Sequence, residues 1–216
     1  MKEKPNEWVS ISDLMAGVMA VVMLLLVLSV LQNKFAALKR EQEKAQGAQT
    51  EQQRVVDMLK SMRSTMDDEG ESGLVSFDLT GSKITLRDRV FARGSACVTD
   101  EARHALSSLG PKIAEFVNGS AQAQVFVEGH TDNVQVSRPV TDYSKFCTVY
   151  DDNFTLSAAR AREARKLLIA LLDEQQAKRV IVAGFGDSQP LPGLEPGDEK
   201  NRRVEVQFLT RPAPRT

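Results

Sequence analysis

The first 32 residues contain a long apolar segment. From Leu14 to Leu31 the chain has 18 consecutive residues without a charge, a glutamine or a proline. As a helix rising 1.5 Å per residue, this segment would reach about 27 Å, close to the hydrocarbon thickness of a bilayer. With residues 9–13 added, it is long enough to cross a membrane with some tilt. The pattern predicts a transmembrane helix over residues 9–32, preceded by a short segment, residues 1–8.

A cleaved secretory signal is the alternative interpretation of this segment. Lys2 and Lys4 precede the apolar run, and Ala36 and Ala37 offer small residues for cleavage. The run is longer than the roughly 7–15 apolar residues of a signal peptide, however, and an acid, Asp13, stands at its start. We therefore expect the anchor to be retained. Basic residues lie on both sides of the span, so charge alone does not orient it.

Residues 33–69 are rich in Lys, Glu, Gln, Arg and Ala, a composition that favours helix. Heptad positions from Leu31 to Leu59 are apolar at both ends but polar in the middle, so a strong coiled coil is not indicated. We expect a helical connector over residues 33–73 that pairs at most weakly with a second copy. It should end at the breaker "DDEGESG".

After Gly73 the pattern changes to short strands and amphipathic helices. It predicts a hairpin of "LVSFDL" and "KITLRD", strands at "QVFVEGH", "RVIVAGFG" and "RRVEVQFL", and helices from Thr99 and over Leu156 to Gln175. The apolar stripe of the second helix comprises Ala164, Leu167, Leu168, Leu171 and Leu172. The order β-α-β-α-β-β predicts an α+β domain, residues 74–210, whose sheet is covered by two helices, followed by a tail, residues 211–216.

Composition changes this picture little. The chain is 42% hydrophobic and 26% charged with a formal net charge of −1, which gives no indication of nucleic-acid binding. Cys97 and Cys147 permit one disulfide if the domain faces an oxidising compartment, and two unpaired buried thiols are the alternative. Two scattered histidines and the lack of a Gly-x-Ser-x-Gly turn argue against a hydrolase or a zinc site. We expect no enzyme activity, no metal and no cofactor.

Polar residues mark a candidate site in the α+β domain. Thr131 and Asp132 follow the strand "QVFVEGH", and Arg160 lies on the apolar side of the next helix. One interpretation is a buried Asp132–Arg160 ion pair that closes the domain. The other is a ligand site in which Arg160 and the helix N-terminus hold a carboxylate while Asp132 holds an ammonium group.

The motifs "VEGHTDN", "NFTLSAARAREARKLL", "VAGFGDSQPL" and "NRRVEVQF" resemble, in order, those of the OmpA-like peptidoglycan-binding domain. The resemblance implies that Asp132 and Arg160 grip the zwitterionic end of diaminopimelate in the stem peptide of peptidoglycan. The positions that would line the same pocket are Thr131, Asn153, Leu156, Asn201 and Arg202. It also implies a single-pass protein of the bacterial inner membrane, with a cytoplasmic N-terminus and a periplasmic domain. Between Asp132 and Asn153 the loop is about a dozen residues longer than the family pattern, which raises the question of access to the pocket.

Asp13 stands at the threshold of the apolar span. It is either a helix-capping or interfacial acid, together with Ser10 and Ser12, or an ion-binding group. The segment "WVSISDLMAGVMAVVMLLLVL", joined to an OmpA-like domain, resembles the B subunits of ion-driven stators, the MotB class, and is most similar to the B subunits (ZorB) of Zorya anti-phage defence systems.

That second resemblance implies a homodimer surrounded by a ring of polytopic A subunits of the MotA or ZorA kind, in which Asp13 carries H⁺ or Na⁺. The small residues Ala16, Gly17 and Ala20 would allow close helix approach. A structural tether between inner membrane and peptidoglycan, and a flagellar stator subunit, are the alternative functions.

Overall fold

The computed structural model describes residues 7–68 and 73–210, except for the side chains of residues 7–10, 13 and 44. The chain divides into two compact units, Met1–Thr50 and Glu51–Thr216, and each is considered by itself. Residues 1–6 of the expected N-terminal segment, residues 1–8, and the whole expected tail, residues 211–216, lie outside the described residues.

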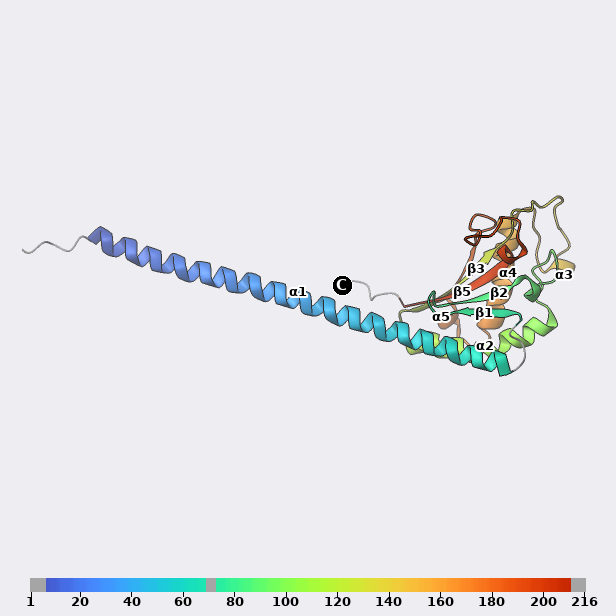
Figure 1. Cartoon of the computed structure of the whole chain (residues 1–216), viewed down its shortest axis with the longest axis horizontal. Helices are drawn as coiled ribbons and strands as arrows, with labels where there is room; N and C mark the ends of the chain where they lie inside the picture. The colour runs from blue at the N-terminus through green and yellow to red at the C-terminus, as the bar shows by residue number, and fades with distance from the viewer. Residues whose placement is uncertain (1–6, 69–72, 211–216) are drawn as a thin grey trace, which may run out of the picture. The chain divides into compact units, whose positions relative to one another are not determined.

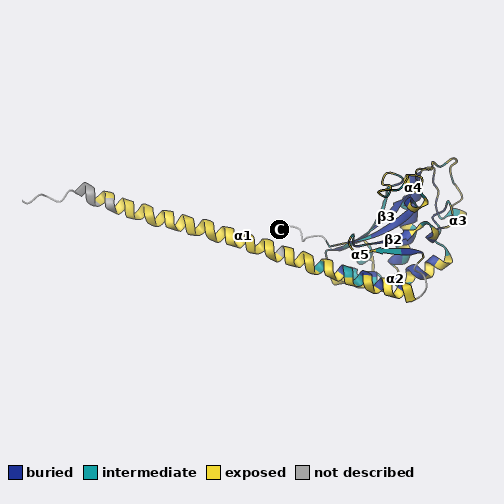
Figure 2. Cartoon of the chain, in the orientation of Figure 1, coloured by how far each residue is buried: buried dark blue, intermediate teal, exposed yellow. Residues whose placement is uncertain are grey.

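The first unit is the N-terminal part of helix α1 (Glu7–Asp68) (Figure 1). Every described side chain from Ile11 to Thr50 is exposed (Figure 2). Leu24 and Leu26 are 61% and 55% exposed, in a run of apolar residues that water would solvate poorly. By length and composition, α1 contains one segment apolar enough to cross a membrane, in the stretch that begins at Leu14.

The last turns of α1 belong to the second unit. Val55, Leu59, Met62 and Met66 recur every three or four residues, so they share one helix face, and all four are buried in the hydrophobic core of that unit. The expected connector, residues 33–73, is therefore helical to Asp68, but its C-terminal part is a core element of the domain. Leu59, which was considered for pairing with a second copy, faces the domain instead.

The second unit contains a five-stranded mixed sheet, which confirms the predicted α+β class. The strands are β1 (Val75–Asp78), β2 (Lys83–Arg87), β3 (Ala123–His130), β4 (Val180–Gly184) and β5 (Arg203–Thr210), in the spatial order β1-β2-β5-β3-β4. Among the described strands, only β3 and β4 pair in parallel, and the chain between them contains a helix that returns it to the same end of the sheet. Short 3₁₀ helices, η1 (Asp88–Val90) and η2 (Glu199–Asn201), lie directly after β2 and before β5.

Helices α2 (Asp100–Gly119) and α4 (Asn153–Leu168) provide the covering layer. Thr99 caps α2 as predicted, through a side-chain oxygen that accepts from the Ala102 N–H. The second helix differs from the prediction, Leu156 to Gln175. Its N-cap is Asp152, it ends at Leu168, and a separate short helix, α5 (Glu174–Ala177), follows a turn. Leu171 is therefore 62% exposed rather than part of the apolar stripe.

Two glycines let the first turns of α4 approach the sheet closely. A Cβ at Gly129, on β3, would collide with the carbonyl group of Ser157, and one at Gly184, on β4, would lie 2.6 Å from the Cβ of Ala158. No side chain fits in either place, so glycine is required by contact rather than by backbone dihedral angles. This contact fixes the N-terminal half of α4, including Arg160, against the ends of β3 and β4.

Candidate functional site

A pocket of about 940 Å³ lies where β3 ends, α4 begins, and η1 and η2 meet. Six of the residues singled out in the sequence line it: Thr131, Asp132, Asn153, Leu156, Arg160 and Arg202. Thr131, Asp132, Asn153 and Arg160 are buried, so the base of the pocket is polar and shielded from bulk water. The fold thus brings together side chains from three separate parts of the sequence.

Arg160 does not pair with Asp132, contrary to one of the two interpretations of the sequence. Its Nη1 lies 3.2 Å from Oδ1 of Asp88, and its Nε donates to the carbonyl oxygen of Ser95 at 3.0 Å. The guanidinium also lies 5.3 Å from the centre of the Phe91 ring. Asp88 is the counter-ion of Arg160, which the sequence patterns did not predict.

Arg202 links the two acids of the pocket. Its Nη1 donates to Oδ2 of Asp132 at 2.7 Å, and its Nε lies 3.1 Å from Oδ2 of Asp88. The four charges therefore form an alternating series, Asp132–Arg202–Asp88–Arg160. The series contains two cations and two anions, so it is neutral overall. All four side chains line the same pocket.

Burial sets the electrostatics of the two arginines. Desolvation lowers the pKa of Arg160, which is 2% exposed, while the negative charge of Asp88 opposes this shift. Desolvation also lowers the pKa of Arg202, but hydrogen bonds to Asp132 and Asp88 outweigh it and raise that pKa overall. Both side chains remain cationic at neutral pH. A buried guanidinium that retains its charge is a strong donor to a ligand carboxylate.

Thr131 provides an unused polar group in the pocket. Thr131 is 4% exposed, and its Oγ1 has no hydrogen-bond partner in the described part of the chain. Buried hydroxyl groups are usually hydrogen-bonded, so an unpaired one that lines a pocket indicates a position for a ligand atom. Asn153 differs, because its Nδ2 donates to the carbonyl oxygens of Asp132 and Val134 and holds that turn in place.

Asn201 does not line the pocket, although the resemblance placed it there. It is fully buried and organises the preceding loop: its Oδ1 accepts from the Leu191 N–H at 2.8 Å, and its Nδ2 donates to the carbonyl oxygen of Glu195 at 2.9 Å. The N-terminus of α4 is also occupied, because Asp152 accepts from the Thr155 N–H at 2.6 Å. This helix end was expected to help bind a ligand carboxylate, but the carboxylate of Asp152 already occupies it.

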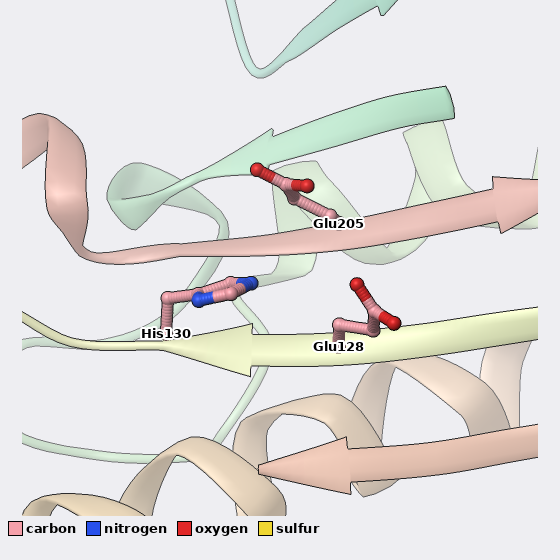
Figure 3. Close-up of side chains that lie close together, drawn as sticks. All are labelled: Glu128, His130 and Glu205. Atoms are coloured by element: carbon pink, nitrogen blue, oxygen red, sulfur yellow. The ribbon is translucent and has the colours of Figure 1, made fainter. Parts of the chain in front are cut away.

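A second group of titratable side chains lies on β3 and β5, outside the pocket. Glu128, His130 and Glu205 stand on one face of the two strands, with one ligand atom from each within 4.8 Å of the others (Figure 3). His130 is 1% exposed, stacks on Phe185, and has no hydrogen-bond partner for either ring nitrogen among the described residues. Glu128 and Glu205 are not among the residues from which the sequence predicts that there is no zinc site.

Two basic side chains decide the character of this cluster. Lys83 and Arg203 bind the two carboxylate oxygens of Glu205 at 2.9 and 2.6 Å. Burial, then the positive charge of Arg203, lower the pKa of His130 to about 4, so the imidazole is neutral at neutral pH. A metal ion would have to compete with both cations for Glu205. As described, these side chains are held together by the ion pairs of Glu205 with Lys83 and Arg203.

Cys97 and Cys147 are joined in a disulfide. Cys97 belongs to the loop that offers the Ser95 carbonyl to Arg160, and Cys147 follows the short helix α3 (Tyr143–Phe146) in the long segment between β3 and α4. Of the two arrangements considered for the cysteines, the structure contains the bridged one.

The side chain of Asp13 lies outside the described residues. Its backbone is part of α1, near the beginning of the apolar stretch. Its role as an ion carrier therefore stays a prediction from the sequence.

The fold and pocket define a class of protein: an α+β domain with a charged pocket, in a chain that also has a helix long and apolar enough to cross a membrane. The sequence profile of the OmpA family matches residues 90–203, and the chain belongs to that family. This stretch includes Asp132, Arg160 and Arg202. A comparison with curated protein sequences gives no match.

The fold is shared with a solved structure, and two further structures are less similar. A MotB-like protein from Desulfovibrio vulgaris is 24% identical, with 74% of this chain and 99% of that chain covered and a TM-score of 0.54. The cell wall anchor of the T6SS from Pseudomonas aeruginosa is 29% identical over 67% of this chain and 93% of that chain, with a TM-score of 0.49. The periplasmic domain of Helicobacter pylori MotB is 18% identical over 63% and 80%, with a TM-score of 0.47.

Proposed function

We propose that this protein is a non-enzymatic B subunit of an ion-driven motor in the bacterial inner membrane, anchored to peptidoglycan by its OmpA-family domain. The observation that carries the anchoring function is the pocket in which Asp132, Arg202, Asp88 and Arg160 alternate beside the unpaired hydroxyl of Thr131. Membership of the OmpA family and the fold shared with a MotB-like protein support it.

The charge series suits a ligand that carries both charges on one carbon. The carboxylate of such a ligand would bind Arg160 and Arg202, and its ammonium group would bind Asp132, so both charged ends of the ligand would make charge-assisted hydrogen bonds. Thr131 would supply a hydrogen bond that no described residue now takes. The amino-acid end of diaminopimelate in the peptidoglycan stem peptide has this chemistry.

Peptidoglycan retention tests the anchoring function. Arg160→Ala and Asp132→Ala should each weaken binding of the full chain to purified peptidoglycan by about 2 kcal/mol, because each removes a charged hydrogen bond to the ligand. Asp100→Ala and Arg103→Ala are matched controls, since they change an exposed pair on α2 outside the pocket. Unchanged retention in both pocket variants would show that the charge series is structural only.

The motor function rests on the sequence of the membrane segment. Two copies of α1 would lie within a ring of polytopic A subunits, and Asp13 would take up and release H⁺, or Na⁺, as its surroundings alternate between the two sides of the membrane. The N-terminus would then be cytoplasmic and the domain periplasmic. Resemblance to Zorya B subunits points to anti-phage defence as the purpose of the motor, without direct contact between this chain and nucleic acid.

A passive tether between membrane and peptidoglycan is the second candidate, because the pocket and the span together are sufficient for it. Asp13→Asn separates the two functions. In a motor, the variant should insert, bind peptidoglycan normally and abolish phage protection when expressed with its partner genes, while Asp13→Glu retains part of it. Full phage protection by Asp13→Asn would favour the tether, and rescue of motility by the native gene in a stator-deficient strain would indicate a flagellar stator.

A further inference from the structure

The segment between β3 and α4 forms a wall of the pocket. We call residues 133–152 the strap. The strap residues that line the pocket are Val134, Gln135, Val136, Ser137, Arg138, Val140 and Tyr150. The strap therefore borders the site instead of filling it, which answers the question of access that its length raised.

Several contacts hold the strap in place. The Cys97–Cys147 disulfide joins it to the loop after η1, where the Ala96 N–H and the Ser95 hydroxyl both donate to the carbonyl oxygen of Phe146 at 3.0 Å. Nearer the pocket, the Tyr150 hydroxyl donates to the carbonyl oxygen of Gly94 at 2.5 Å. The same loop presents the Ser95 carbonyl to Arg160, so the strap and the charge series share one support.

The outer part of the pocket has a different charge from its base. Arg89, Arg93 and Arg138 line it, are exposed, and form no ion pair within residues 7–68 and 73–210. The only acid that joins them at the mouth among the described lining residues is Glu199, whose carboxylate lies 3.7 Å from Arg202. The base is neutral overall, so the mouth carries the excess positive charge.

The pocket is also larger than one amino-acid end requires. Its volume of about 940 Å³ is near the upper end of the range of about 300–1,000 Å³ for sites that enclose drug-sized ligands. A ligand that fills it extends from the charge series to the strap. Unpaired guanidinium groups that line the same pocket as the charge series favour a second anionic group on the same molecule.

We propose that the strap builds an outer subsite, in which Arg138 and Arg93 bind a further carboxylate of a peptide whose zwitterionic end occupies the charge series. This inference rests on the proposed anchoring function and specifies its ligand. In the stem peptide the corresponding group is the free α-carboxylate of the γ-linked glutamate that precedes diaminopimelate. The strap thus selects for a carboxylate at that position over a carboxamide.

Calorimetric titration of the full chain in detergent tests the subsite with three probes: free diaminopimelate, the tripeptide alanyl-γ-glutamyl-diaminopimelate, and the same tripeptide with the glutamate α-carboxylate amidated. The native protein should bind the carboxylate tripeptide about threefold to tenfold more tightly than the amidated one, as expected for one partly exposed charged contact. Arg138→Ala combined with Arg93→Ala should remove this difference and leave the affinity for free diaminopimelate unchanged.

Control variants separate the subsite from the anchoring function and from folding. Arg103→Ala, an exposed arginine outside the pocket, should keep the native preference. Cys97→Ser with Cys147→Ser should reduce affinity for the tripeptide more than for free diaminopimelate, because it releases the strap. Equal affinity of the native protein for both tripeptides, or a preference that survives the double arginine variant, overturns the subsite. If the native protein binds none of the three probes, the anchoring function itself is overturned.

Discussion

Asp88→Asn tests whether Asp88, rather than Asp132, neutralises the buried charge of Arg160. The substitution keeps the size of the side chain and one acceptor oxygen but removes the negative charge between two guanidinium groups, 3.2 Å from Arg160 and 3.1 Å from Arg202. Arg160 then has no anionic partner among the described residues, and only neutral groups, including the Ser95 carbonyl and the Phe91 ring, remain beside it. Arg202 retains Asp132.

The expected cost follows from the burial of the pair. At an effective dielectric constant of about 20, opposite charges about 4 Å apart attract by about 4 kcal/mol, and breaking a buried pair costs about 3–5 kcal/mol. The side chain of Arg160 is 3% exposed and that of Asp88 is 28% exposed, so solvent screening reduces the loss. We expect the free energy of unfolding to fall by about 3 kcal/mol.

Scanning calorimetry of the full chain in detergent at pH 7 measures this change. About 3 kcal/mol in the unit Glu51–Thr216 corresponds to a fall in Tm of about 6–12 °C. Asp132→Asn is the matched control and should cost only about 1 kcal/mol, because Arg202 keeps Asp88. A larger fall in Tm for Asp132→Asn than for Asp88→Asn would refute the pairing described above.

Three further changes have defined outcomes. The pKa of His130 is about 4 in the folded chain and 6.5 in the unfolded chain, so between pH 7 and pH 5 mainly the unfolded chain takes up the proton. The free energy of unfolding should therefore fall by about 2 kcal/mol as the pH drops from 7 to 5. His130→Phe should remove this part of the slope of Tm against pH. Replacing Cys97 and Cys147 by serine should cost about 4 kcal/mol, given a sequence separation of 50, and a Tm within 2 °C of the native value would contradict this. Leu59→Ala should destabilise the domain by about 3 kcal/mol in calorimetry, whereas exposed Leu38→Ala should have little effect on it.

The local pattern of the sequence was sufficient to predict the strands and helices of the α+β domain, apart from some of their ends. Strands and helices of the α+β domain follow from apolar periodicity and from turn and cap residues, all of which act over a few neighbouring positions. The errors also have local causes. Helix α4 begins earlier than predicted because Asp152 is its N-cap. It ends at Leu168, and a second N-cap, Asp173, then starts α5.

The pocket was predicted only in part. Thr131, Asp132, Asn153, Leu156, Arg160 and Arg202 do line one pocket, but Asn201 is buried outside its lining, and the sequence patterns did not predict Asp88. The register of two strands that are distant in the sequence is what places Asp88 in the pocket. Arg87 of β2 pairs with Arg203 of antiparallel β5, so the residue after the first strand, Asp88, meets the residue before the second, Arg202.

The sequence by itself determined the apolar span of α1, the order of strands and helices, and the family, because each depends on residues close together in the chain or on motifs in order. Only the tertiary structure decided which acid faces Arg160, that Leu59 packs into the domain, and that the strap borders the pocket. The physical reason is that ion pairing and burial depend on distances in space. Those distances are set by strand register and helix packing across more than one hundred residues, as between Asp88 and Arg202.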